Sequence, residues 1–248
     1  MRLIVPGCDR VPDCRNSFKM ASILVYKKLV KKGAESYIHD GIFLGREILI
    51  KERRPKPYRH SELDARLRKS RIKAEIKVLR SLKDKSIKVP SVLAHDALRF
   101  AFAMGKISGD LLHEVLANKG EEECTRACEK LGEQTGMMHQ QNIYHGDLTP
   151  YNVIVDAAEG MDVYLIDFGL AGFSHDIEKY ASDLLVLQQT LEGLFPRKHR
   201  SFFDSFKRGY TAVFKEESDS FQIYQKMEKI LLRGRYVSRK KRKEAGMI

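Results

Sequence analysis

Long hydrophobic segments are missing from this chain of 248 residues. A helix that crosses a membrane needs about 20 consecutive apolar residues, and no run in the sequence approaches that length. Near the N-terminus the apolar run Leu3–Val5 ends at Pro6, which makes it too short for the hydrophobic core of a signal peptide. We therefore expect a soluble protein that is not exported and that works in a reducing compartment.

Cysteine is also scarce, since the chain has only four. Cys8 and Cys14 have five residues between them, and Cys124 and Cys128 lie one helical turn apart, so neither pair has the spacing of a zinc site. Cys124 and Cys128 fall on the apolar face of an expected helix. Because buried thiols behave as small apolar side chains, we expect both to belong to the core rather than to a metal or redox centre.

Acidic residues are outnumbered, with 33 against 45 lysines and arginines, so the net charge is +12 and the isoelectric point is near 9.5. This balance favours polyanionic partners such as nucleotides, RNA or acidic protein surfaces. The basic residues cluster at 51–80 and at 233–243. The second cluster has little apolar content, so we expect an exposed arm that is either solvated or contacts nucleic acid or a partner, or serves nuclear import.

No segment repeats at a fixed period, and residues 1–19 show no periodicity, so we expect those residues to form a disordered extension. The predicted elements that follow are an antiparallel sheet over 23–53, a helix over 61–83, strands within 91–100 and 101–107, a helix within 108–120, a long helix over 121–140, a hairpin of 152–155 and 163–167, and helices from 183 onward. A β-rich part with one helix is thus followed by a helical part with an inserted hairpin, which predicts an α+β fold.

The stretch "YHGDLTPYNVIV" contains an acid, Asp147, and a carboxamide, Asn152, directly before the first strand of that hairpin. The second strand leads into "IDFG", so Asp167 lies at the other end of the hairpin and the three side chains can converge on one point. Mg²⁺ prefers a few protein oxygens and otherwise water and phosphate. The spacing predicts that Asn152 and Asp167 hold Mg²⁺, while Asp147 orients or deprotonates an acceptor. A lone "DFG" is weak evidence, whereas "HGDLxxxN" followed by "DFG" strongly indicates phosphoryl transfer.

Phosphoryl transfer also needs a cation at the nucleotide phosphates, and Lys51, at the end of the strand "ILIK", is the candidate. On the helix predicted over 61–83, Glu75 falls on the apolar stripe between Ile72 and Leu79. A buried carboxylate without a partner costs several kcal/mol. We therefore expect Glu75 to pair with Lys51.

Taken together, these residues resemble the protein-kinase fold, with an N-lobe, a hinge and a helical C-lobe. More narrowly, the strings "KKGAES", "PYRHSELD", "MHQQNIYHGDLTPYN", "DFGLA" and "LLRGR" resemble the PRPK-type family of small atypical kinases of the KEOPS complex. The resemblance implies a bilobal α+β fold. The N-lobe, over 20–104, would be a small antiparallel β-sheet with one long helix, and the C-lobe, over 105–235, would be mainly helical. Residues 236–248 would form a basic tail.

The resemblance also implies a function. It points to a Mg-ATP-dependent atypical serine/threonine protein kinase and ATPase, with ATP and Mg²⁺ as cofactors. As a KEOPS subunit it would bind the threonylcarbamoyl transferase subunit and other KEOPS subunits, and would support threonylcarbamoyl adenosine modification of tRNA in the cytoplasm and nucleus. The basic tail would assist tRNA contact, and no membrane partner is implied.

Carried over position by position, Lys51 matches the family's phosphate-binding lysine and Glu75 matches its helix partner. Asp147 matches the catalytic aspartate. Asn152 and Asp167 match the metal ligands.

Three further positions follow from the same resemblance. The glycine-rich loop is reduced to "KKGAES", with Gly33 alone where conventional kinases have three glycines, so a shorter and more basic flap would cover the ATP phosphates. Met104 matches the hinge methionine beside the adenine, although the residues after it are Gly105 and Lys106 where relatives often have acids. His145 is expected to pack and hydrogen-bond within the loop rather than act as a general base.

Some positions depart from conventional protein kinases. Gly146 stands where those enzymes usually have the arginine that reads a phosphorylated activation loop, and Thr149 stands where they commonly have a lysine. No "APE" follows "DFG", and Asp183, which resembles the aspartate at the opening of the central C-lobe helix, comes only 16 positions after Asp167. Activation by loop phosphorylation and a peptide-substrate platform are therefore not expected.

Three other functions stay open from the residues. An independent serine/threonine kinase shares the catalytic motif but needs the missing platform. A small-molecule kinase of the aminoglycoside or choline type shares "HGDxxxxN" but usually carries a large acceptor-binding insertion. A non-catalytic scaffold or RNA-binding subunit would fit the basic tail, yet such a protein would be expected to lack Lys51, Asp147 or Asp167.

Overall fold

The computed structural model describes residues 24–33, 35–158 and 160–233. The predicted disordered extension over 1–19 and the basic tail over 236–248 lie outside these residues. The chain divides into two compact units, and each is described by itself. The first comprises the described residues up to Ile72 together with Val92–Lys106, and the second comprises Lys73–Ser91 together with the described residues from Ile107 onward.

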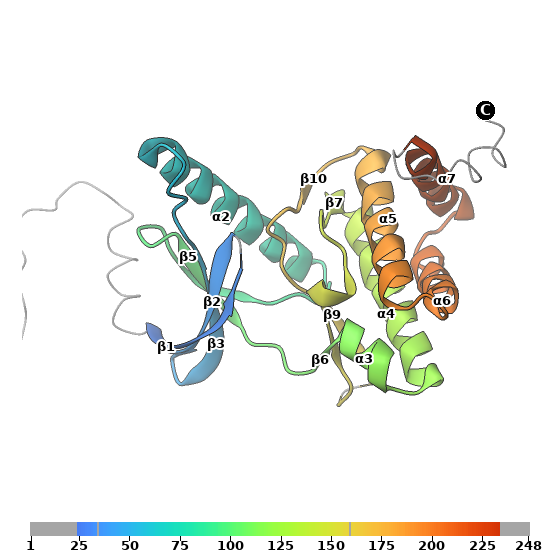
Figure 1. Ribbon diagram of the computed structural model, residues 1–248, viewed down its shortest axis with the longest axis horizontal. Coiled ribbons are helices and arrows are strands. Elements are labelled where there is room, and N and C mark those ends of the chain that lie inside the picture. The colour runs from blue at the N-terminus through green and yellow to red at the C-terminus, as the bar shows by residue number, and fades with distance from the viewer. Residues whose placement is uncertain (1–23, 34, 159, 234–248) are drawn as a thin grey trace, which may run out of the picture. The chain divides into compact units, whose positions relative to one another are not determined.

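The first unit is built on a five-stranded sheet in which every neighbouring pair of strands is antiparallel, in the order β1-β2-β3-β5-β4 (Figure 1). This confirms the predicted antiparallel sheet. The strands are β1 (Leu24–Lys32), β2 (Ser36–Phe43), β3 (Arg46–Arg53), β4 (Val92–Asp96) and β5 (Ala101–Gly105). The turn from β2 to β3 is tight because Leu44 and Gly45 both have left-handed backbone angles, with φ of 50° and 77°.

Strand β3 lies at the centre of this sheet and carries the predicted lysine. Ile48 and Ile50 point to one face of the strand and are fully buried in a cluster with alanines of β5. Successive side chains of a strand point to opposite faces, so Lys51 lies on the other face, paired in register with Ile38 of β2 and Phe102 of β5. The position of Lys51 is thus set by the hydrophobic alternation of β3.

Helix α2 (Ser61–Asp84) begins in the first unit and ends in the second, and it spans almost the residues predicted for it. In the second unit α3 (Leu112–Asn118), α4 (Glu121–Gln140), α5 (Ile177–Leu194), α6 (His199–Ala212) and α7 (Glu217–Arg233) follow in chain order. Of these, α4 occupies the predicted residues and α3 is the short one. Helix α5 begins six residues before Asp183 because the Asp176 side chain caps it by accepting the N–H of Glu178 at 2.9 Å.

The predicted hairpin is formed by β8 (Val153–Asp156) and β9 (Asp162–Leu165), and β6 (Asp110–Leu111) adds a third strand that the sequence did not predict. A two-residue strand is too short to show a period in the sequence. A second small sheet pairs β7 (Ile143–Tyr144) with β10 (Gly172–Phe173). A 3-10 turn, η1 (Pro150–Asn152), leads into β8. Within the described ranges, no helix is both long and apolar enough to cross a membrane.

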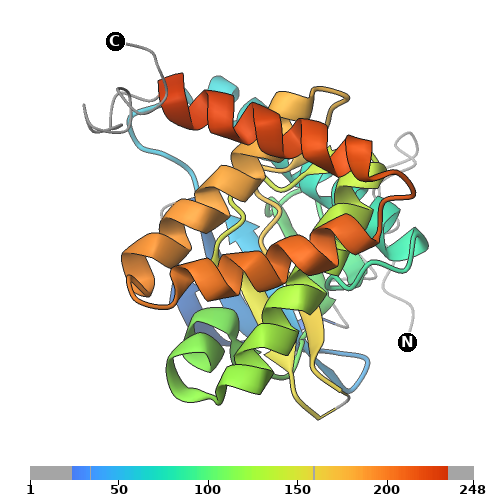
Figure 2. The same cartoon turned by 90° about the vertical axis from the view of Figure 1, so that its right-hand side faces the viewer.

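The backbones of helices α4 and α6 approach each other closely. Figure 2 shows the helices of this unit face-on. Glycines make this approach possible. A Cβ atom at Gly209 of α6 would lie 1.9 Å from the carbonyl oxygen of Glu129, and a Cβ atom at Gly132 of α4 would lie 2.1 Å from the carbonyl oxygen of Phe206. Both distances are far below van der Waals contact, so only glycine fits at these two positions.

We predict that Gly209→Ala lowers the free energy of unfolding by about 1–3 kcal/mol or more, because the added methyl group would force α6 away from α4. The matched control is Gly193→Ala in α5, where an added Cβ meets nothing within 4 Å. That change should raise the free energy of unfolding by roughly 0.5–1 kcal/mol, since alanine is the better helix former. Urea denaturation of both variants checks this, and equal effects would contradict the close packing.

Candidate active site

The catalytic-loop motif holds Asp147 and Asn152 together by two hydrogen bonds. The Asn152 side-chain nitrogen donates to the Asp147 carbonyl oxygen and to its carboxylate Oδ2, both at 2.9 Å. The Asn152 side chain is 7% exposed, whereas Asp147 is exposed to solvent. With its nitrogen committed to Asp147, Asn152 has its amide oxygen left as the atom that suits a cation.

Asp167 is brought beside this pair by the hairpin. Val153 of β8 pairs with Leu165 of β9, and the Ile166 N–H donates to the Asn152 carbonyl oxygen at 3.0 Å. Asp167 follows directly, is exposed, and has a left-handed backbone with φ of 62°. Left-handed residues other than glycine are uncommon and concentrate at functional sites. The register of two short strands therefore gathers the two predicted metal ligands at one end of the hairpin.

The donor set fits Mg²⁺ that is shared with phosphates. The three side chains offer only carboxylate and amide oxygens, the ligands that Mg²⁺ prefers. The described part of the chain holds no group of three or more His, Cys, Asp and Glu side chains that could form a complete metal cage. Mg²⁺ usually takes one or two carboxylates from the protein and completes its shell with water and substrate phosphates. The observed oxygens suit that mode of binding.

His145 links the loop that carries Asp147 to the strand end that precedes Asp167. Its ring is fully buried, its Nε2 donates to the Ile166 carbonyl oxygen at 3.0 Å, and its Nδ1 accepts the Asp147 N–H at 3.3 Å. The Phe168 ring packs on it with centroids 4.8 Å apart. Burial lowers the pKa of His145 and outweighs the opposing effect of the nearby Asp183 carboxylate. The neutral ring is thus used on both nitrogens, as the packing role predicted for it requires, and is not placed to act as a general base.

Asp183 is the site residue whose role the sequence reasoning missed. It lies in the second turn of α5 rather than at its opening, and it is 2% exposed. Its Oδ2 accepts the His145 N–H at 2.6 Å and its Oδ1 accepts the Gly146 N–H at 2.8 Å. A carboxylate directly before the apolar run "LLVL" was the signal, because an acid on a buried helix face needs partners of its own.

Gly146 has a structural reason to be glycine. Its φ is 80°, and a Cβ atom there would lie 2.5 Å from the carbonyl oxygen of Leu170. No side chain fits such an approach to a backbone carbonyl. The loop around Asp147 therefore packs against the segment that follows "DFG", at the position where conventional kinases have arginine.

Lys51 and Glu75 are each buried, with exposures of 3% and 2%. Glu75 lies on the buried stripe of α2 with Ile72, Ile76 and Leu79, as the helical period predicts. Lys51 belongs to the first unit and Glu75 to the second. Their pairing stays a prediction.

Gly33 and Met104 both belong to the first unit. Gly33 follows β1, and its N–H donates to the Ser36 carbonyl oxygen at 2.9 Å, which closes the turn into β2. Met104 lies near the end of β5, in register with Leu49 of β3 and Val92 of β4. Their contacts with ATP likewise stay predictions.

The two cysteines of α4 are buried in the core, as predicted. Cys124 is 2% exposed and Cys128 is 1% exposed, and neither forms a disulfide. Burial raises the pKa of both thiols. Neither is therefore suited to redox or nucleophilic chemistry.

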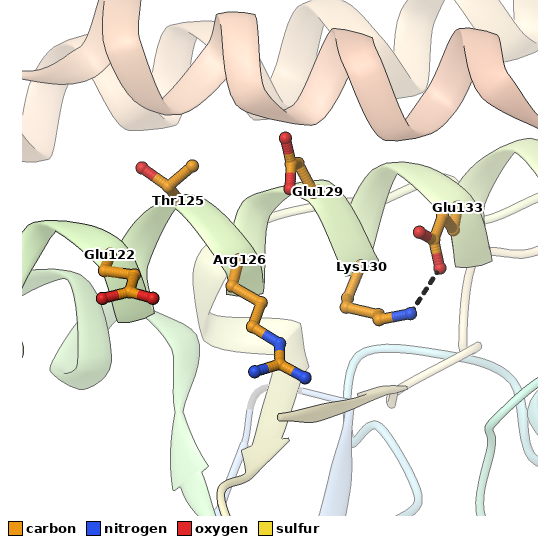
Figure 3. A pocket seen from close by; sticks show the side chains of 6 residues that line it. All are labelled: Glu122, Thr125, Arg126, Glu129, Lys130 and Glu133. Carbon is orange, nitrogen blue, oxygen red and sulfur yellow. Dashed lines mark hydrogen bonds and ion pairs between the residues drawn. The ribbon is translucent and has the colours of Figure 1, made fainter. Parts of the chain in front are cut away.

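A hollow of about 440 Å³ is lined by side chains along α4 (Figure 3). Two of its acids form ion pairs, Glu133 with Lys130 of the same lining at 3.0 Å and Glu129 with Arg208 of α6 at 2.8 Å. The residues that line it are Glu122, Thr125, Arg126, Glu129, Lys130 and Glu133. No predicted site residue is among them.

The amino-acid sequence of this chain is similar to those of known proteins. The RIO domain family matches residues 48–181. The KEOPS complex subunit Bud32 of Pyrococcus abyssi is 36% identical over 218 residues, which cover 86% of this chain and 97% of that protein.

Longer proteins match as well. A probable bifunctional tRNA threonylcarbamoyladenosine biosynthesis protein of Methanosphaera stadtmanae is 33% identical over 84% of this chain. Its counterpart in Methanothermobacter thermautotrophicus is 34% identical over 91% of this chain. The matched region spans 36% and 39% of these two relatives, little more than a third of their length.

The buried His145 predicts a pH dependence of stability. Its folded pKa lies below the ordinary value of 6.5, so the unfolded chain binds this proton more tightly. The stabilisation is complete above about pH 6.5 and is lost as the pH falls below it, by at most about 1.4 kcal/mol per pH unit. We expect His145→Gln to make the decline in unfolding free energy between about pH 7 and 5.5 shallower, as urea denaturation at several pH values would show.

The control for this experiment is His175→Gln, at an exposed histidine of the same unit. Its pH profile should follow the wild type. A His145→Gln profile with the wild-type slope would mean that the buried ring accepts a proton as readily in the folded chain as in the unfolded one.

Proposed function

The chain belongs to the Bud32 family of RIO-domain proteins, and from this membership and the geometry of its loop we propose an ATP-dependent kinase-like enzyme that acts as a KEOPS subunit in tRNA threonylcarbamoyladenosine modification. The observation that carries the catalytic part is the pair of Asn152–Asp147 hydrogen bonds beside Asp167. This arrangement presents one carboxylate to an acceptor and two oxygens to a cation.

The proposed reaction transfers the γ-phosphoryl group of ATP to a hydroxyl group. The oxygen of that hydroxyl forms the new bond to phosphorus while the bond to the ADP oxygen breaks, and Asp147 orients the hydroxyl and takes its proton. Asn152 and Asp167 would hold Mg²⁺, which when bound neutralises charge on the phosphates. Lys51 would contact the phosphates with Glu75 as its partner, and Gly33 and Met104 would border the nucleotide.

The acceptor is proposed to be water or a serine or threonine of a partner protein. Two observations support an acceptor set by partners rather than by a peptide-binding platform. Gly146 occupies the position at which conventional kinases have the arginine that reads a phosphorylated loop, and its close approach to the Leu170 backbone leaves no room for a side chain there. The segment after "DFG" is short and held by the β7–β10 pair before α5 begins at Ile177. No comparable observation favours the alternative, an independent serine/threonine kinase that binds its own peptide substrates.

The partners are proposed from the relatives. Bud32 of Pyrococcus abyssi is named as a KEOPS subunit, and the bifunctional relatives carry the matched region beside a larger remainder of the same chain. We propose that this chain binds the threonylcarbamoyl transferase and other subunits of KEOPS, with tRNA reached through the complex and the basic tail. Work in the cytoplasm and nucleus is part of the same proposal.

The catalytic assignment predicts that Asp147→Ala and Lys51→Ala each lower Mg²⁺-dependent ATP turnover at least a thousand-fold, which corresponds to about 4 kcal/mol of transition-state stabilisation. The reason is that phosphoryl transfer depends mainly on positioning and charge stabilisation. Steady-state ATP hydrolysis by the purified chain with its KEOPS partners and tRNA measures this.

Matched controls are Asp204→Ala on α6 and Lys119→Ala after α3, both exposed. These variants should keep wild-type turnover. Turnover by Asp147→Ala or Lys51→Ala at the control level, with the fold intact by circular dichroism, would disprove the roles given to these residues.

For the tail, we predict that removal of the residues after Arg233 weakens tRNA binding without changing ATP binding. For each tRNA phosphate that the tail neutralises, its removal should make the slope of log affinity against log salt shallower by about 0.7–0.9. A tail of unchanged length with the five basic residues of 239–243 replaced by glutamine separates charge from length. Equal tRNA affinity of all three proteins at low and moderate salt would rule out a role of the tail in tRNA binding.

A further inference from the structure

A buried chain of polar side chains runs from α6 to the candidate catalytic loop. Its members are Tyr210 on α6, His139 on α4 and Asp183 on α5, with exposures of 0%, 2% and 2%. His139 Nδ1 lies 2.8 Å from the Tyr210 hydroxyl, and His139 Nε2 lies 3.2 Å from Asp183 Oδ2. Polar groups this deeply buried are stable only when they are hydrogen-bonded. Each of these three side chains therefore depends on its neighbour in the network.

The groups at the two ends of this network favour one set of donor and acceptor roles. Both Asp183 carboxylate oxygens accept backbone N–H groups, Oδ2 from His145 and Oδ1 from Gly146, so the His139 Nε2 that lies 3.2 Å from Oδ2 is the donor to this acceptor. When the His139 ring carries this one proton, its other nitrogen is an acceptor. The Tyr210 hydroxyl keeps its proton, because burial raises the pKa of Tyr210, and it therefore donates to His139 Nδ1.

At its other end the chain reaches the backbone next to Asp147. The two Asp183 oxygens accept the N–H groups of His145 and Gly146, the two residues that directly precede Asp147. The orientation of the Asp183 carboxylate therefore sets the direction in which the loop leaves β7. A change in how His139 donates to Asp183 would shift that carboxylate and with it the Asp147 side chain.

The hydroxyl of Tyr210 is not needed for packing. The ring lies among aromatic rings, with centroids 5.7 Å from Phe206, 5.1 Å from Phe214 and 5.7 Å from Tyr224. A phenylalanine ring would make the same contacts, and burying an unused hydroxyl is unfavourable. The bond to His139 is what the hydroxyl adds to this cluster.

We propose that Tyr210 is a positioning residue for the catalytic loop: its hydroxyl holds His139 in the tautomer that donates to Asp183, and Asp183 in turn holds the backbone before Asp147. The effect on catalysis rests on the proposed ATP turnover. The effect on the loop backbone does not depend on turnover and can be measured by itself.

The test compares Tyr210→Phe with Tyr224→Phe. Tyr224 is a neighbour in the same aromatic cluster, and its hydroxyl is not part of the hydrogen bonds that join Tyr210, His139 and Asp183. Both variants remove one hydroxyl from one buried ring. We expect Tyr210→Phe to lower kcat for ATP hydrolysis by roughly tenfold, equivalent to about 1.4 kcal/mol in the barrier, with an unchanged KM for ATP. Tyr224→Phe should keep the wild-type kcat.

The second measurement is hydrogen exchange of the His145 and Gly146 amides, together with the nitrogen-15 signals of the His139 ring. Tyr210→Phe should speed exchange at both amides and remove the wild-type signature of a ring protonated at Nε2 alone, while Tyr224→Phe changes neither. This result supports the proposal even where the wild type fails to hydrolyse ATP, an outcome that would overturn only the proposed function. Wild-type exchange and ring signals in a folded Tyr210→Phe protein would overturn the inference, and so would a wild-type kcat in an active enzyme.

Discussion

The carboxylate of Asp183 is the group on which the geometry of the candidate active site depends. It accepts two backbone N–H groups from the loop and one bond from His139, all within the protein interior. An ionised carboxylate can be buried only when such donors replace water. The loop is thereby tied to α5 and, through His139, to α4, so its course is set by helices that belong to the core.

The polar groups of the site fall into two classes that differ in burial. His145, Asp183 and the Asn152 amide nitrogen are buried and engaged in hydrogen bonds within the protein. Asp147 and Asp167 are exposed and offer carboxylate oxygens to solvent. Buried groups that are fully bonded stiffen the loop, and the two exposed carboxylates each accept one hydrogen bond as well, Asp147 from Asn152 and Asp167 from the Gly169 N–H. This division suits phosphoryl transfer, which relies on positioning and charge.

The close packing of α4 and α6 connects the core to this arrangement. Gly132 and Gly209 allow the two helices to approach until an added methyl group would overlap the opposite backbone. Tyr210 directly follows Gly209, and His139 lies two turns beyond Gly132, so this approach brings the tyrosine hydroxyl to the histidine ring. The hydrogen bond between Tyr210 and His139 thus depends on the close helix packing that the two glycines allow.

How much of this could be read from the sequence depends on the range of the interactions involved. The 3.6-residue period of α2 was sufficient to place Glu75 on a buried face. The apolar run before Lys51 was sufficient to put this residue near the end of a strand, although β3 continues to Arg53. The "HGDLTPYN" and "DFG" strings identified the family, and the hairpin between them was predicted with nearly the observed residues. Local periods and motifs carry this information because the responsible contacts lie within a few residues.

The sequence by itself determined the antiparallel sheet, the long helices, and the "HGDLTPYN" and "DFG" strings with the candidate site residues they contain. Only the tertiary structure decided that Asp183 holds the loop, that His145 is neutral and bonded through both nitrogens, and that Gly146 is required by Leu170. Each of these rests on a contact between segments far apart in the chain, such as the 44 positions from His139 to Asp183. Hydrogen bonds of that range leave no period in the sequence, because they exist only once the helices have packed.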